Sequence, residues 1–444
     1  MQHALDLSVS ASVPLAGEIL LPGDKSLSHR AALFAALAEG TSTIDRFLVS
    51  GVTRAMLNAL TALRVDWRLE GTRLTVHGKG LRGFTQPRAP LFCGNSATTL
   101  RLLAGALAAS GTPCVLDGST GLRKRPMNRI TEPLQRMGVP VTTPNTCTPL
   151  TLAARAASAP LHAMSYTLPV ASAQVKSCLI LAALAADGVT TLSEPGASRD
   201  HTERMLASMG ADIRVHEPLT IRIAPLTRPL LPFTLELPGD ISSAAFLLVA
   251  AALVPGSSVR IRDVGLNPTR TGILDVLRAM GSDIRIEQPR IVSGEPVGDI
   301  RLTAAPLKAT SVAGATVVRM IDEFPVFAMA ACFADGVTEV RDAEELRYKE
   351  TDRISVMCGE LKKLGVRLEE RQDGFTIHGG TLTGGDCEAH GDHRLAMSLA
   401  LAGLASPRPV TVHHAEILSE SFPAFVPQLR VLGAAVREYI PAIL

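Results

Sequence analysis

The chain has 444 residues, of which 46% are hydrophobic and 19% charged. This length predicts about two to three domains, and the composition is typical of a globular protein rather than a disordered one. Lysine and arginine number 44 and aspartate and glutamate 42, so the formal net charge is only +2, and aromatic residues make up 4%. We therefore expect no nucleic-acid partner. A surface that binds a polyanion needs more positive charge, and one that stacks bases needs more aromatic side chains.

The seven cysteines are scattered, and no two of them form a C-x-x-C pair. This argues against a disulfide framework and against a zinc knuckle, and it favours a reducing compartment. The first residues have no basic segment followed by an apolar one, and the longest apolar run, residues 244–254, is about half a membrane span. We expect a cytoplasmic protein with no membrane segment and no metal site.

Along the chain, one pattern occurs six times: a small polar residue at a Gly-rich or Pro-rich break, then an Ala/Leu-rich stretch that Gly or Pro closes. The polar residues are 68 to 82 positions apart, a longer period than that of the familiar solenoid repeats. Their side chains are those that cap helix N-termini, so six buried helices are predicted. The six predicted caps are Asp24, Asn95, Ser172, Asp240, Asp322 and Asp392.

After each of these helices the sequence predicts a Thr/Val-rich strand and then a second helix. Alternating segments that follow read as hairpins around Gly71 and Gly374. The repeat is thus helix, strand, helix, two strands, and the fold class is α/β; six such repeats could form one ring or two domains of three. In five repeats the second helix should end at a left-handed glycine: Gly138, Gly210, Gly281, Gly365 and Gly433.

Eight short motifs, taken together and in this order, resemble the 5-enolpyruvylshikimate-3-phosphate synthase family over nearly the whole chain. Any one of them alone would be weak. The residues of the first and fourth motifs resemble those of the subgroup of that family that is insensitive to glyphosate. The motifs are PGDKSLSHR (22–30), GNSATTLR (94–101), KRPM (124–127), ASAQVKS (171–177), SRDHTE (198–203), IDEFP (321–325), YKETDR (348–353) and GDHR (391–394).

The resemblance implies two similar domains, each of three α/β repeats arranged as an inside-out barrel, with the active site in the cleft between them. We place one domain at residues 21–236 and the other, discontinuous, at residues 1–20 plus 237–444. The implied reaction transfers the enolpyruvyl group of phosphoenolpyruvate to the 5-hydroxyl of shikimate 3-phosphate and releases phosphate. It serves aromatic amino acid biosynthesis. We expect a monomer that needs no metal and no organic cofactor.

Both implied substrates carry several negative charges, so their site needs cations and helix N-termini. The resemblance assigns the binding residues for each substrate. For shikimate 3-phosphate these are Lys25, Ser26, Arg30, Ser172, Ala173, Gln174, Arg199, Asp322 and Lys349. For phosphoenolpyruvate they are Lys25, Ala97, Arg125, Gln174, Arg353 and Arg394.

The resemblance also implies the catalytic roles. Asp322 is the base that takes the 5-hydroxyl proton, Glu350 exchanges the proton at the vinyl carbon, and Lys25 touches both substrates. Taken by themselves, the residues leave simpler roles open. Asp322 could merely cap a helix, and Lys349 and Arg353, four apart on one predicted helix face, could form a surface ion-pair face with Glu350.

Two positions depart from patterns common in the family. Ala97 stands where many members have Gly, and its methyl group should crowd glyphosate, the longer competitor of phosphoenolpyruvate, more than the substrate. Glyphosate is therefore expected to be a weak inhibitor at most. Glu420 stands where one subgroup has Lys, which removes one expected cation, and the role of His393 in GDHR is left open.

Three other functions fit the sequence less well. The enolpyruvyl transferase that acts on a UDP-linked aminosugar has Asn after the first Lys and usually Cys on the mobile loop, whereas this chain has Ser26 and no Cys in residues 118–127. RNA 3′-phosphate cyclases use similar repeats, but they call for ATP and nucleic-acid surfaces, and no G-x-x-x-x-G-K-[ST] loop is present. A non-catalytic homologue is disfavoured because Asp322, Glu350 and the arginines are present.

Overall fold

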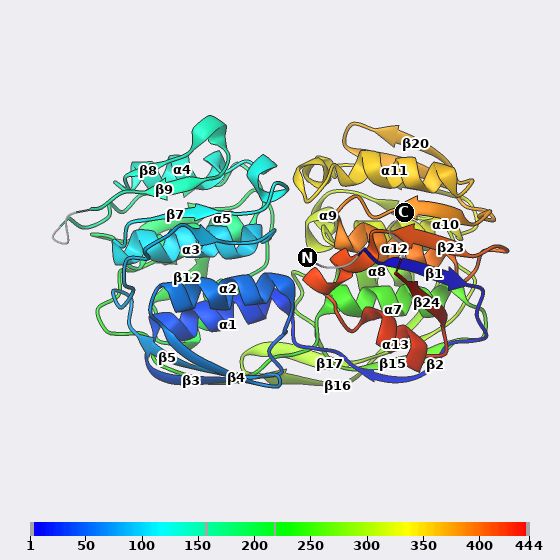
Figure 1. The fold of residues 1–444 in the computed structure, drawn as a ribbon, viewed down its shortest axis with the longest axis horizontal. Coiled ribbons are helices and arrows are strands. Elements are labelled where there is room, and N and C mark those ends of the chain that lie inside the picture. The colour runs from blue at the N-terminus through cyan, green and yellow to red at the C-terminus, as the bar shows by residue number, and fades with distance from the viewer. Residues whose placement is uncertain (1–3, 156–158, 217–218, 441–444) are drawn as a thin grey trace. The chain divides into compact units, whose positions relative to one another are not determined.

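A computed structural model describes residues 4–155, 159–216 and 219–440. Its contacts divide the chain into two compact units, and each is described by itself (Figure 1). Unit 1 comprises Met1–Pro22, Pro238–Ile291 and Pro296–Leu444, and unit 2 comprises Gly23–Leu237 and Val292–Glu295.

Unit 2 contains the first three repeats. Its helices alternate with strands as the sequence predicts, and short 3-10 helices η1 (Leu122–Lys124) and η2 (Pro144–Thr146) interrupt the second repeat. The α-helices are α1 (Lys25–Leu37), α2 (Gly51–Ala62), α3 (Ala97–Ser110), α4 (Asn128–Arg136), α5 (Ala173–Ala183) and α6 (His201–Ser208). The strands are β3 (Glu39–Asp45), β4 (Asp66–Glu70), β5 (Arg73–Lys79), β6 (Leu91–Phe92), β7 (Cys114–Asp117), β8 (Val141–Thr142), β9 (Leu150–Leu152), β10 (Ser165–Thr167), β11 (Thr190–Ser193), β12 (Ile213–His216), β13 (Thr220–Ile223) and β14 (Thr234–Glu236).

Unit 1 contains the other three repeats together with the N-terminal strands, and the 3-10 helices η3 (Glu344–Tyr348) and η4 (Ala415–Glu420). Its α-helices are α7 (Ile241–Leu253), α8 (Gly272–Ala279), α9 (Ala315–Arg319), α10 (Phe324–Cys332), α11 (Arg353–Lys363), α12 (His393–Ala402) and α13 (Phe425–Val431). Its strands are β1 (Asp6–Ser10), β2 (Ala16–Leu20), β15 (Ser258–Gly265), β16 (Asp283–Val292), β17 (Glu295–Thr303), β18 (Ser311–Val312), β19 (Val337–Val340), β20 (Arg367–Arg371), β21 (Gly374–His378), β22 (Gly385–Glu388), β23 (Val410–His413) and β24 (Ala435–Tyr439).

Within the described residues, each unit contains three four-stranded sheets, so the predicted repeat lacks one strand. The missing strand lies at a sheet edge and pairs in parallel with the strand that follows the repeat's first helix, as β6 pairs with β7 and β18 with β19. These edge strands are only 2 to 5 residues long, too short to show an alternating pattern. In the sixth repeat, β1 lies between β23 and β24, so the N-terminal strand completes the last sheet.

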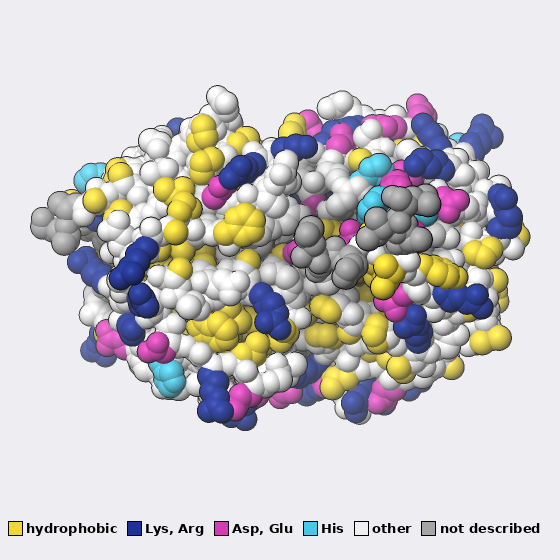
Figure 2. Space-filling model, viewed as in Figure 1, with side chains coloured by type: hydrophobic (Ala, Val, Ile, Leu, Met, Phe, Trp, Pro, Cys, Tyr) yellow, Lys and Arg dark blue, Asp and Glu magenta, His cyan; other side chains and the backbone are white. Residues whose placement is uncertain are grey.

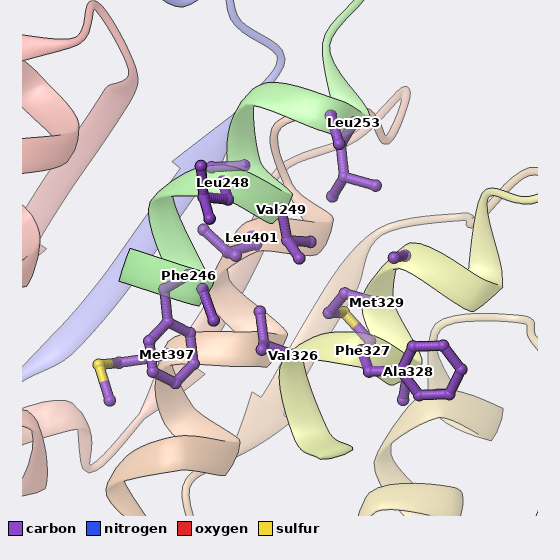
Figure 3. Packing of buried hydrophobic residues seen from close by; sticks show 14 of the residues in the cluster. Phe246, Leu248, Val249, Leu253, Val326, Phe327, Ala328, Met329, Met397 and Leu401 are labelled. Carbon is purple, nitrogen blue, oxygen red and sulfur yellow. The ribbon is translucent and has the colours of Figure 1, made fainter. Parts of the chain in front are cut away.

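The first helix of every repeat forms the core, as predicted. In unit 2, α3 packs against both α1 and α5, and in unit 1, α7, α10 and α12 pack against one another. Figure 3 shows the unit 1 contact, where Phe246 and Leu248 of α7 approach Val326 of α10 and Leu401 of α12. Every residue of α7 is buried, which explains why its sequence is apolar on all sides rather than amphipathic.

The predicted helix ends are largely confirmed. Four of the predicted caps accept a hydrogen bond from a backbone N–H of the first helical turn: Asp24, Ser172, Asp240 and Asp392. The other two predictions are wrong. Ser96, not Asn95, caps α3. Asp322 lies in the turn before Glu323, which is the N-cap of α10.

The left-handed ends of the second helices are also confirmed. The five predicted glycines have φ between 85° and 98°. In the remaining repeat, α2 ends at Leu63, and Arg64 adopts the left-handed conformation with φ 63°. Both hairpins exist, but Gly374 lies inside β21, where a Cβ would lie 2.0 Å from the Val340 carbonyl oxygen. That glycine is needed for close backbone approach rather than for the turn.

Candidate active site

The starts of α1, α3 and α5 meet in unit 2. His29 of α1 places Nδ1 2.7 Å from the Lys25 carbonyl oxygen and Nε2 3.3 Å from Ser96 Oγ, the cap of α3. Burial lowers the pKa of His29 to about 4, so the ring is neutral, with Nδ1–H donating to the carbonyl and Nε2 accepting from Ser96. From α5, Gln174 Nε2 donates to Thr98 Oγ1 of α3 at 2.9 Å. Three helix N-termini, each with partial positive charge, thus lie together.

Cationic side chains surround these helix starts, and their hydrogen bonds orient them. Arg199 Nη1 donates to Ser26 Oγ at 3.3 Å, which joins two predicted site residues from distant motifs. Arg30 is buried and donates from Nε to Thr202 Oγ1 at 2.7 Å and from Nη2 to Ser177 Oγ at 2.9 Å. These contacts fix the guanidinium beside the first turn of α1.

A third arginine, Arg101 of α3, reaches across to α5. Arg101 Nη1 donates to Gln174 Oε1 at 2.6 Å, and Nη2 donates to the Pro126 carbonyl oxygen at 3.0 Å. The bond to Pro126 places Arg101 next to the motif of Arg125, which is itself buried after η1. Ser172 caps α5, and Ala173 begins that helix, so its N–H is among those with no partner inside the helix. Ala97 begins α3 and is 2% exposed. We name these residues the unit-2 cluster: Lys25, Ser26, Arg30, Ala97, Arg101, Arg125, Ser172, Ala173, Gln174 and Arg199.

In unit 1, three cations surround Asp322. Its Oδ1 lies 3.7 Å from Lys349 Nζ and 3.6 Å from Arg353 Nη1, and its Oδ2 lies 3.8 Å from Arg394 Nη2. Arg394 Nη1 also donates to the Asp322 carbonyl oxygen at 3.1 Å. The capping role left open for Asp322 is thereby excluded. Its carboxylate lies instead among three opposite charges.

The prediction that Lys349 and Arg353 share one face of a helix is wrong. Lys349 follows η3, whereas Arg353 is the first residue of α11, and Asp352 caps that helix between them. The chain therefore turns between the two cations. The turn still brings both ammonium and guanidinium groups to the same oxygen of Asp322.

Arg353 is the buried centre of a carboxylate network. Its Nη2 donates to Glu350 Oε2 at 2.6 Å and its Nε donates to Asp392 Oδ2 at 2.7 Å. Burial opposes the charge of Arg353, but Asp392 and Glu350 outweigh burial and raise its pKa. Burial alone would raise the pKa of Asp392, but the Arg353 guanidinium outweighs it and lowers that pKa. We name Asp322, Lys349, Glu350, Arg353, Asp392 and Arg394 the unit-1 cluster.

The starts of α7, α10 and α12 also meet, as their counterparts in unit 2 do. Ser242 of α7 donates to Glu323 at the start of α10, and Arg270 Nη2 donates to Ser242 Oγ at 2.9 Å. Arg394 of α12 brings Nη1 to 3.9 Å from Glu323 Oε1. His393 is the buried first residue of α12, and Glu420 is the last residue of η4.

The surface agrees with the small net charge. In Figure 2, lysine and arginine side chains are spread over the visible face beside acidic ones, with broad uncharged areas between them. Across residues 4–155, 159–216 and 219–440, no three His, Cys, Asp or Glu side chains converge so that they could hold a metal ion. In that same part of the chain, no helix is long and apolar enough to cross a membrane.

The repeated α/β units, with cations and helix N-termini gathered at the starts of buried helices, define an enzyme class that binds phosphorylated anions. Comparison with known proteins identifies the family within this class. The chain belongs to the EPSP synthase (3-phosphoshikimate 1-carboxyvinyltransferase) family, whose model matches residues 9–429.

Individual relatives agree. The chain is 46% identical to the 3-phosphoshikimate 1-carboxyvinyltransferase of Syntrophomonas wolfei over 425 residues, which cover 95% of this chain and 98% of that protein. Its identity to the Geotalea uraniireducens enzyme of the same name is 47% over 413 residues, covering 92% and 95% of the two chains. The solved structure of EPSP synthase from Acinetobacter baumannii is 39% identical, with a TM-score of 0.86 and coverage of 98% and 100%. The predicted α/β fold and the predicted transferase activity, in which phosphoenolpyruvate and shikimate 3-phosphate are the substrates, are confirmed.

The sequence did not point to several buried residues in or beside these clusters. His29, Asp392 and Lys176 are buried and hold the predicted site residues in place, but they had been given no such role. A signal for Lys176 existed, because it is a charge within the apolar stretch VKSCLILAA.

Proposed function

We propose that the unit-2 cluster mainly binds the anionic groups of the substrates. In the unit-1 cluster, we propose that Asp322 and Glu350 move protons during enolpyruvyl transfer while Lys349, Arg353 and Arg394 contact the substrates. In this proposal, Ser26, Arg30, Ser172, Gln174, Arg199 and the Ala173 N–H hold shikimate 3-phosphate. Support comes from the hydrogen bond of Arg199 to Ser26 and from the helix start at Ser172, since guanidinium groups and helix N-termini both suit phosphate oxygens.

The residues assigned to phosphoenolpyruvate, in the same proposal, are Lys25, Arg125, Gln174, Arg353 and Arg394. Gln174 is oriented for such a role by Arg101 and Thr98, which fix both ends of its amide. These two hydrogen bonds hold the Gln174 side chain rigidly. Such preorganisation favours binding, because the amide is already in position when the substrate arrives. Lys25 contacts both substrates.

The observation that carries the chemical proposal is the convergence of three cations on Asp322. The Asp322 carboxylate takes the proton of the 5-hydroxyl as that oxygen bonds to the enolpyruvyl carbon that bears the phosphate. Glu350 gives a proton to the vinyl carbon in that addition. When the carbon–oxygen bond to phosphate breaks, Glu350 takes a proton back from the same carbon and the double bond re-forms. Lys349 holds the shikimate moiety near Asp322.

Three finer points belong to the same proposal. Ala97 should make the phosphoenolpyruvate pocket poorly suited to glyphosate, although its methyl group packs with the apolar core of unit 2. All proposed site residues come from one chain, so a monomer suffices for activity. The seven cysteines are free thiols, which fits action in a reducing compartment such as the cytoplasm.

Coupled phosphate release tests the reaction. The purified protein should release phosphate and form enolpyruvylshikimate 3-phosphate when mixed with the two substrates, without ATP and in the presence of a metal chelator. Omission of either substrate is the control. Product formation only with a UDP-linked aminosugar as acceptor would refute the proposal.

A further inference from the structure

A buried charged group lies behind the proposed binding surface of unit 2. The Lys176 ammonium lies 2.7 Å from Glu194 Oε2 and 2.7 Å from Glu203 Oε1, and all three side chains are at most 5% exposed. Lys176 is in the second turn of α5, Glu194 follows β11, and Glu203 is in the first turn of α6. Taking such charges out of water is costly, so this cluster needs a reason beyond simple packing.

The cluster holds the segment that carries Arg199. Lys176 Nζ donates to the Ser198 carbonyl oxygen at 3.3 Å, and Ser198 Oγ donates to Glu194 Oε1. The peptide bond that starts Arg199 is thereby fixed on one side. On the other side, Thr202 Oγ1 lies 2.6 Å from Ser177 Oγ and accepts from Arg30 Nε. Residues 176 and 177 of α5 therefore anchor the chain on both sides of Arg199.

The charges of the cluster are consistent with a rigid anchor. Burial disfavours the ammonium of Lys176, but Glu203 and Glu194 outweigh burial and raise its pKa. Burial raises the pKa of Glu203 despite the nearby ammonium, as expected when two carboxylates share one cation. The raised pKa of Lys176 therefore favours its charged form.

We propose that Lys176 is a positioning residue that, through Ser198 and Glu194, holds Arg199 in the orientation that binds the phosphate of shikimate 3-phosphate. This inference rests on the proposed role of Arg199 in binding that substrate. Arg199 donates to Ser26 across to α1, so a shift of its backbone would disturb both side chains at once. A small displacement of a binding group is enough to lose much of its effect.

A double-mutant cycle tests this role. We would titrate shikimate 3-phosphate by calorimetry into the parent protein, Lys176→Met, Arg199→Gln and the double variant. Lys176→Met should raise the dissociation constant by about tenfold to a hundredfold in the parent, and by less than about twofold when Arg199 is already replaced. Lys79→Met, at an exposed lysine of the same unit, is the control and should leave the dissociation constant unchanged.

Because Lys176→Met leaves two buried carboxylates, the milder Ser198→Ala is run through the same cycle. It removes one hydrogen bond and keeps the ion pairs, so it should weaken binding by about twofold to tenfold, again only when Arg199 is present. Equal effects with and without Arg199 would overturn the positioning role. An unchanged dissociation constant in Arg199→Gln itself would overturn the proposed role of Arg199, and the inference with it.

Discussion

The two units use the same scaffold for different electrostatic tasks. In both, the starts of three buried helices meet, but the partners of the cations differ. In the unit-2 cluster, arginines donate to hydroxyl and amide groups, as Arg199 does to Ser26 and Arg101 to Gln174. In the unit-1 cluster, the cations lie against carboxylates, as Arg353 does against Asp392 and Glu350.

This difference indicates how one repeated fold can serve binding and chemistry together. Cations paired with neutral groups keep much of their charge for an incoming phosphate. Cations that lie against carboxylates fix the positions of those carboxylates, as Arg353 does for Glu350 and Asp392, and in our proposal Arg353 and Arg394 also contact phosphoenolpyruvate. Substitutions in each cluster test whether the two units divide the work in this way.

The largest effect is expected at the centre of the unit-1 cluster. Asp322→Asn should lower kcat by about 10²–10⁴, because it removes the proposed base while keeping the shape of the side chain. Steady-state kinetics would measure this, with Asp283→Asn, an exposed aspartate of β16 in the same unit, as the matched control. A loss of less than about tenfold in a folded variant would show that Asp322 is not the base.

A smaller effect is expected at the start of α3. Ala97→Gly should tighten glyphosate binding by about 1–3 kcal/mol, or roughly tenfold to a hundredfold, if the methyl group crowds the inhibitor. The Michaelis constant for phosphoenolpyruvate should change far less. Ala108→Gly, near the far end of the same helix, controls for the loss of a helical methyl group. Identical inhibition constants in the parent and Ala97→Gly would mean that the methyl group serves only the core, in which it is 2% exposed.

Differences between the units that lie outside the clusters should matter little. Arg64 in unit 2 has φ 63°, where every other repeat has glycine. Arg64→Gly should therefore raise the free energy of unfolding by about 0.5–1 kcal/mol, as the relieved strain exceeds the added chain entropy. Urea denaturation would measure it. Gly210→Ala is the reverse control, since a Cβ there meets nothing closer than 4.0 Å and should cost about 1 kcal/mol through φ alone. No stabilisation in Arg64→Gly would show that the left-handed arginine is not strained.

The smallest effect on stability is expected beside the pairing of β1 with β23 in unit 1. His413 pairs with Asp6 and His414 with Glu388. Burial lowers the pKa of His413, but Asp6 outweighs burial, and for His414 the hydrogen bond to Glu388 leads, so both pKa values are raised. A histidine whose pKa is raised by folding stabilises the protein fully at pH values below its unfolded-state pKa, near 6.5. This stabilisation is lost as the pH rises through the folded-state pKa.

Replacing both histidines by Gln should therefore lower the free energy of unfolding at pH 5.5 and not at pH 8.5. The loss should be about 0.5 kcal/mol, because both pairs are partly exposed and screened by solvent. His77→Gln, on β5 of unit 2, is the control. A larger loss at pH 8.5 than at pH 5.5 would contradict the direction of the pKa shifts.

Sequence reasoning reached the helices and their ends because these depend on local chemistry. The apolar stretch of α7 and the glycine after α4 can be interpreted without knowing what lies nearby. The edge strands could not be predicted in this way, since Leu91–Phe92 is a strand only because β7 lies beside it. The contribution of β1 to the last sheet likewise depends on residues about 400 positions away in the chain.

The sequence named candidate residues for the site, but it did not predict their geometry. The motifs named Asp322, Lys349 and Arg353, yet spacing put the two cations on one helix, and the structure separates them by the cap of α11. The buried anchors Lys176 and Asp392 act through other side chains, and such roles appear only when the partners are placed. Periodicity carries no information about which distant carboxylate a lysine meets.

The division between binding and chemistry is tested most directly by titrating shikimate 3-phosphate, without phosphoenolpyruvate, into Arg199→Gln and Asp322→Asn. Arg199→Gln removes a charge-assisted hydrogen bond, so the dissociation constant should rise by at least about tenfold. Asp322→Asn should change it by less than about threefold while turnover falls. The reverse order, with binding lost in Asp322→Asn and retained in Arg199→Gln, would contradict the account.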